Sequence, residues 1–211
     1  MKICSSIFHC LSQMNSITYT LLSDGPFDIA LRPILTWLLI TNGVRFAIQA
    51  EWADLRTLKN PPTVLAHRIS AAIQNYPCDL VFIHRDAERQ SRTDRVREIR
   101  RAIDALSCII EYPPYICVIP VRMTEAWLFF EEQAIRTAAG NSHGRELLDL
   151  PPPRKIESLP DPKSLLYDLL RSASGLRGRR LNNMPVSVYA ARVSELIEDF
   201  SPLRQLSAFS A

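Results

Sequence analysis

The sequence predicts an α/β fold: a mostly parallel sheet with helices on both faces, followed by a C-terminal helical appendage. Short apolar and β-branched runs alternate with longer stretches of helical periodicity over roughly the first 140 residues, as in successive βαβ units. The run Leu80–Ile83 is apolar at every position, as expected for a strand buried on both faces. Beyond Gly140 the pattern changes, because prolines cluster there.

Four strands are expected, at about residues 16–23, 44–50, 79–85 and 115–121. The second alternates apolar and polar residues, which places it nearer an edge of the sheet. Between parallel strands the connections should be right-handed crossovers. Each crossover is therefore expected to carry its helix across one face of the sheet.

Helices in this part are expected at residues 27–41, 62–75, 92–107 and 124–139. The first has apolar residues at helical spacing and a stop signal at Asn42-Gly43. The helix from Arg92 carries four arginines on its polar face, interleaved with acidic residues. A solvated face with internal ion pairs is the commoner outcome for such a pattern, and contact with a phosphate backbone is the alternative.

The two ends of the chain differ from the sheet region. Residues 1–13 lack clean periodicity, so we expect a poorly ordered extension before a domain of residues 14–140. Residues 141–211 are expected to form a proline-rich linker and a helical appendage packed on that domain, with helices near 163–172 and 186–199. The basic segment 175–180 is interpreted either as a solvated loop or as a clamp for a nucleic acid backbone.

The composition is that of a soluble globular protein, with 47% apolar and 22% charged residues among 211. The chain contains no apolar run long enough to span a bilayer. Its net charge of +3 gives no general basic field that would indicate nucleic acid binding. The five cysteines include no Cys-x-x-Cys pair, which favours a cytoplasmic location and argues against zinc.

Acidic residues follow three of the predicted strands: Asp24 with Asp28, Asp86 with Glu88, and Glu125. Any one of them alone would be a helix cap or a partner of the helix dipole. Because the carboxyl ends of parallel strands meet at one edge, ligands gather there in open α/β sheets. Three acid-bearing strand ends at that edge therefore predict a metal site, and oxygen ligands suit Mg²⁺.

The segments Leu21–Asp28 and Val81–Glu88 resemble the Toprim domain, a Rossmann-like fold of topoisomerases, primases and related nucleases. More closely, the chain resembles a family of small uncharacterised bacterial Toprim-like proteins that are often encoded beside an ATPase in phage-defence loci. The segments Ile119–Leu128, Pro162-Lys163 and Ser201–Leu206 also carry this resemblance. It spans most of the chain from Met14 onward.

The resemblance implies a metal-dependent nuclease for DNA or RNA, acting as the effector of a defence system with an ATPase partner. Asp24 takes the place of the Toprim glutamate, and Asp86 and Glu88 that of its Asp-x-Asp. Both sites depart from the Toprim residue types. We expect these three as catalytic residues, and with Glu125 as ligands of Mg²⁺ or Mn²⁺.

Four further residues are expected to orient ligands or bind substrate: Asp28, His84, Arg85 and Arg122. For His84, a buried structural role is slightly favoured. The partner is expected to be nucleic acid, bound through its phosphates. In the alternative interpretation, the protein has a Toprim-like fold but no catalytic activity, and it serves as a binding or regulatory subunit of an ATPase complex. A nucleotide-binding flavodoxin-like enzyme is disfavoured, because the six glycines form no phosphate-binding loop.

Overall fold

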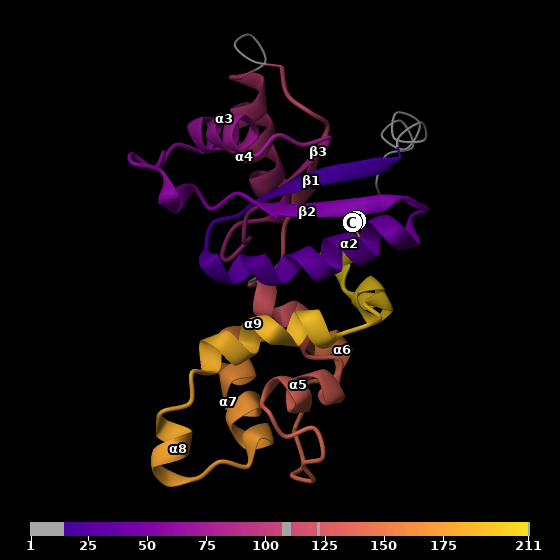
Figure 1. Ribbon diagram of the computed structural model, residues 1–211, viewed down its shortest axis with the longest axis vertical. Helices are drawn as coiled ribbons and strands as arrows, with labels where there is room; N and C mark the ends of the chain where they lie inside the picture. The colour runs from indigo at the N-terminus through magenta and orange to yellow at the C-terminus, as the bar shows by residue number, and fades with distance from the viewer. Residues whose placement is uncertain (1–14, 107–110, 122, 211) are drawn as a thin grey trace. The chain divides into compact units, whose positions relative to one another are not determined.

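The computed structural model describes residues 15–106, 111–121 and 123–210, and the chain divides into two compact units. The first extends to Ile119 and the second comprises Pro120–Ser210 (Figure 1). The division lies upstream of the boundary expected near Gly140, and the helical residues 124–138 contact later helices of the second unit. The expected N-terminal extension, residues 1–13, lies outside the described residues.

The first unit contains a four-stranded sheet in the order β2-β1-β3-β4, in which every neighbouring pair is parallel. The strands are β1 (Ser16–Leu22), β2 (Ala47–Trp52), β3 (Leu80–His84) and β4 (Tyr115–Val118). This confirms the predicted α/β, Rossmann-like arrangement. The chain adds β2 on one side of β1 and then returns to add β3 on the other side. The direction of winding therefore switches between β1 and β3.

Helices cover both faces of this sheet (Figure 1). A 3-10 turn η1 (Pro26–Ala30) leads into α2 (Leu31–Thr41) on one face. On the other face α3 (Leu65–Asn75) packs against α4 (Arg92–Asp104). A second 3-10 turn, η2 (Leu55–Thr57), follows β2.

The helix expected at 27–41 is divided into a 3-10 turn and an α-helix, and Pro33 explains the position of the break. Pro33 lacks an N–H group and is tolerated only in the first turn of an α-helix. The α-helix accordingly begins at Leu31, and the preceding turn is 3-10. Asp28 consequently lies in η1 and not inside a regular helix.

The end of α2 explains why β2 starts three residues later than expected. Gly43 has φ of 101°, and the N–H groups of Gly43 and Val44 donate to the carbonyls of Ile40 and Leu39 at 3.0 and 3.1 Å. This pair of hydrogen bonds is a Schellman motif. Val44, the first residue of the expected strand, therefore belongs to the helix cap. Val44 is buried as part of that cap.

Alternation along the strands divides the core into two layers. Tyr19 faces α2, where its hydroxyl donates to the Arg32 carbonyl at 2.9 Å and shares a 2.9 Å hydrogen bond with Thr36. The Tyr19 ring meets Phe82 edge-on at 5.2 Å between centroids. Burial raises the pKa of Tyr19 to about 12. On the opposite layer, Leu22, Val81 and Ile83 pack with residues of α3 and α4.

The second unit is helical in its described residues. Its longer helices are α5 (Glu132–Ala138), α7 (Pro162–Ser174) and α9 (Val186–Leu196), which contact one another. Shorter elements are η3 (Thr124–Leu128), α6 (Pro153–Ile156), α8 (Gly178–Asn182), η4 (Ser201–Gln205) and α10 (Ser207–Ser210). The single helix expected at 124–139 is thus two segments, with extended backbone at Glu131 between them.

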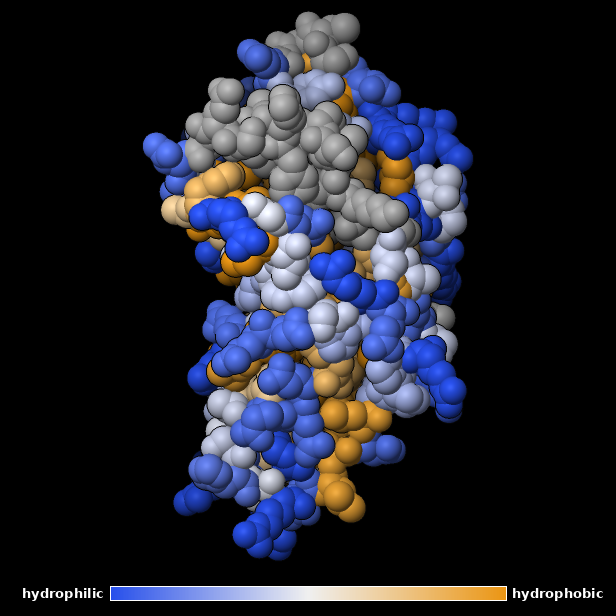
Figure 2. Space-filling model, turned by 90° about the vertical axis from the view of Figure 1, so that its right-hand side faces the viewer, coloured by the Kyte–Doolittle hydropathy of each residue, from blue (hydrophilic) through white to orange (hydrophobic). Residues whose placement is uncertain are grey.

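Hydrophilic side chains cover most of the face in Figure 2, and hydrophobic ones show between them in smaller groups. Within the described part of the chain, no helix has both the length and the apolar character needed to cross a membrane.

Replacing Tyr19 by Phe should lower the free energy of unfolding by about 1 kcal/mol, because it removes the two hydroxyl contacts and leaves the buried ring in place. Urea denaturation measures the change. Tyr167→Phe is the matched control, since that ring is only partly buried, and it should change stability by less than about 0.5 kcal/mol. Equal effects of the two changes would contradict the role given to the Tyr19 hydroxyl.

Candidate metal centre

The candidate site lies at the carboxyl ends of β1 and β3, where the winding of the sheet switches direction. Crevices at such switch points are the usual ligand sites of open α/β sheets. The loop after β1 carries Asp24 and leads to Asp28 in η1. The residues that follow His84, the last residue of β3, are Arg85 and Asp86.

Strand alternation brings His84 to this site. Phe82 and His84 point to the same side of β3, and Phe82 contacts Tyr19 on the α2 side. Asp28 lies in the turn that leads into α2, so it meets the imidazole on that side. Both side chains are buried, with 1% of His84 and 6% of Asp28 exposed.

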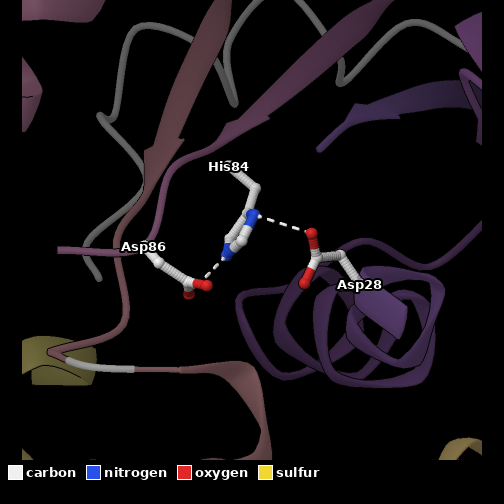
Figure 3. A group of neighbouring side chains, drawn as sticks. All are labelled: Asp28, His84 and Asp86. Atoms are coloured by element: carbon white, nitrogen blue, oxygen red, sulfur yellow. Dashed lines mark hydrogen bonds and ion pairs between the residues drawn. The ribbon is translucent and has the colours of Figure 1, made fainter. Parts of the chain in front are cut away.

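The imidazole of His84 lies between two carboxylates (Figure 3). Its Nδ1 is 3.3 Å from Oδ2 of Asp28, and its Nε2 is 3.2 Å from Oδ1 of Asp86. The same Asp28 Oδ2 accepts the N–H of Gly25 at 2.8 Å, which orients this carboxylate. One potential ligand atom from each of the three residues lies within 4.8 Å of the others, so this group could hold a metal ion.

The two carboxylates set the protonation of the imidazole. Burial alone would lower the pKa of His84, but hydrogen bonds to Asp28 and Asp86, and their charges, raise it to about 9. Burial also raises the pKa of Asp86, and the charges of Asp28 and Asp24 add to this rise, while His84 opposes it. At neutral pH the group therefore holds a proton that a metal ion would have to displace.

Asp24 lies at the same edge but is engaged by two arginines. Its Oδ1 accepts from Nη1 of Arg68 at 2.7 Å and from Nη1 of Arg85 at 3.0 Å. Arg68 also donates to the Ser23 carbonyl at 2.6 Å, and Arg85 pairs with Glu98 at 3.0 Å. The charge of Asp24 raises the pKa of Asp86, but the ligand group contains Asp28 and His84 beside Asp86 and does not include Asp24.

Glu88 points away from this group. Its backbone φ is 52°, a left-handed conformation, and 67% of its side chain is exposed. Extended backbone would have sent Asp86 and Glu88 to the same side, and the left-handed turn at Glu88 ends that alternation. The nearest charge described for Glu88 is Nη2 of Arg95 at 3.9 Å, and Arg95 also donates to the Asp86 carbonyl at 2.9 Å.

Two further expected site residues are Glu125 and Arg122. Glu125 is buried in η3 of the second unit. Arg122 lies outside the described residues. The group of Asp28, His84 and Asp86 is formed within the first unit alone.

A pocket of about 290 Å³ opens beside Asp24 and Arg68, beyond the ends of β1 and β2. Trp52 and Arg56 also line it, with the guanidinium of Arg56 lying 5.2 Å from the centroid of the Trp52 ring. The pocket gives solvent and small groups access to Asp24.

Comparison with known proteins assigns no family: no family model, curated protein or solved structure matches the chain. The chemistry of the group is therefore inferred from its own atoms. Two carboxylates and one imidazole suit Mn²⁺ or a later transition metal better than Mg²⁺, which prefers oxygen ligands alone.

The free energy of unfolding should fall as the pH rises from 6.5 toward about 9, by an amount on the order of 3 kcal/mol. Folding raises the pKa of His84, so the charged imidazole stabilises the folded state. This stabilisation is fully present below pH 6.5 and is lost as the pH rises through the pKa of the folded state, about 9. His84→Gln should remove this dependence. His67→Gln, at an exposed histidine, should preserve it. Denaturant titrations across this range measure it, and identical profiles for wild type and His84→Gln would contradict the charged imidazole.

Proposed function

We propose that the protein is a metal-dependent phosphodiesterase acting on nucleic acid, with Asp28, His84 and Asp86 at its centre. The observation that carries the proposal is the convergence of these three side chains at the switch point of a parallel sheet. Clustered carboxylates at such a position are usually compensated by a cation. The resemblance to Toprim domains in the segments around Asp24 and Asp86 supports the same reaction class.

The residues of the chain have distinct tasks in this proposal. Asp28 and Asp86 supply oxygen ligands, and His84 supplies a nitrogen once its proton has left. A divalent cation held there would polarise a phosphodiester and lower the pKa of a coordinated water. Asp24 acts through its charge on Asp86, while Arg68 and Arg85 limit the negative charge that an approaching phosphate meets.

A second candidate function is a non-catalytic binding or regulatory subunit of an ATPase complex. The engagement of Asp24 by two guanidinium groups and the outward direction of Glu88 favour it. In this alternative the Asp28–His84–Asp86 group serves stability, with the imidazolium as its permanent cation. An ATPase partner and a role in phage defence in the cytoplasm are proposed from the resemblance under either function.

Asp28→Ala and Asp86→Ala should each lower Mn²⁺-dependent cleavage of single-stranded DNA or RNA by roughly a hundredfold or more, because each removes a ligand. Glu88→Ala should keep most of the activity, since this side chain points to solvent. Asp149→Ala, at an exposed position, controls for a general loss of negative charge. Wild-type protein without cleavage, even with an ATPase partner present, would favour the binding subunit.

Mn²⁺ affinity should rise with pH between 6.5 and about 9, by up to about tenfold per pH unit, because the ion competes with the His84 proton. Titrations followed by electron paramagnetic resonance measure free Mn²⁺ at each pH. His84→Gln should bind more weakly and with little dependence on pH over this range. A wild-type affinity independent of pH would show that His84 is not a ligand.

A further inference from the structure

A second hollow lies in the helical unit and is lined by residues of that unit. Its volume is about 640 Å³, and its lining includes Leu176, Arg179, Arg180, Met184, Pro185 and Tyr189. The apolar side chains and the tyrosine ring form part of this lining, and the two arginines add positive charge. Asn183 also lines the hollow.

Two glycines shape the segment that carries these arginines. Gly175 ends α7 with φ of 64°, and Gly178 begins α8 with φ of 55°. Both angles lie in the left-handed region, which glycine adopts without strain. The segment expected as a basic loop is thereby partly a helical turn, in which Arg179 and Arg180 occupy defined positions.

The arginines of this segment are not paired with acidic side chains in the described part of the chain. Among the residues that the structure describes, Arg177, Arg179 and Arg180 form no ion pair, and all three are exposed. Arg171 on α7 differs, because its Nη1 pairs with Asp168 at 2.9 Å. The hollow is therefore a positively charged site whose guanidinium groups are free to bind an anion.

We propose that this hollow binds single-stranded nucleic acid, the substrate class of the phosphodiesterase, an inference that rests on the proposed function. Planar guanidinium groups form bidentate hydrogen bonds with phosphate oxygens. A tyrosine ring beside them offers a stacking surface for an unpaired base. An acidic peptide would satisfy Arg179 and Arg180, but it would leave the ring of Tyr189 and the apolar lining without a planar partner.

The test is fluorescence anisotropy with labelled oligouridylate and oligothymidylate in EDTA, so that binding is measured without metal-dependent cleavage. Arg179→Gln combined with Arg180→Gln should reduce the salt slope of log K by roughly one to one and a half. Tyr189→Leu should weaken binding about tenfold at constant slope. The matched control Arg171→Gln removes the same charge from an existing ion pair and should leave affinity close to that of wild type.

Weaker binding of either polymer in the arginine and tyrosine variants, with the control unaffected, supports the proposal. Wild-type affinity in the double arginine variant overturns it. Equally tight binding of a polyglutamate peptide, with the same loss in the variants, overturns it in favour of an acidic protein partner.

Hydrolysis of bis(p-nitrophenyl) phosphate with Mn²⁺ separates this inference from the proposed function, because so small a diester needs no second binding site. Hydrolysis that depends on Asp86, without oligonucleotide binding, would overturn the inference and keep the phosphodiesterase. Binding without hydrolysis of either substrate would keep the nucleic acid site and argue against the phosphodiesterase.

Discussion

The arrangement of this edge of the sheet depends on the pairing of the buried His84 imidazole with two carboxylates. A charged group with 1% exposure is tolerated only when it is paired and hydrogen-bonded. Asp28 and Asp86 supply that pairing from opposite sides, at 3.3 and 3.2 Å. They also tie the loop after β1 to the loop after β3, as does the ion pair between Asp24 and Arg85. The same pairing that holds the edge together collects the potential metal ligands.

Around this group, arginines and acids form a connected chain of ion pairs. Arg68 on α3 binds Asp24, Asp24 binds Arg85, and Glu98 on α4 joins Arg85 to Arg95. Each pair on its own is partly exposed and contributes little to stability. Together they fix the direction of Asp24, and they explain why the charge of this residue reaches Asp86 while its oxygen stays engaged with guanidinium groups.

The fold could be predicted from the sequence more completely than the site could. The apolar run at 80–83 and the alternation of elements gave the parallel sheet and the edge at which the acids gather. Side-chain directions that depend on a single backbone angle could not be inferred from the sequence. An example is Glu88, whose φ of 52° turns its side chain outward. The pairing of Asp28 with His84 joins residues 56 positions apart (84 − 28). Strand alternation indicates only that His84 lies on the same side of β3 as Phe82.

The central claim, that Asp28, His84 and Asp86 form a metal centre, is tested most directly by anomalous X-ray diffraction from crystals soaked in Mn²⁺ near pH 9, where the proton of His84 competes only weakly with the ion. The account predicts one strong anomalous peak within coordination distance of all three side chains, absent in crystals of Asp86→Ala. No peak at the carboxyl ends of β1 and β3, with the imidazole still hydrogen-bonded to both carboxylates, would contradict it.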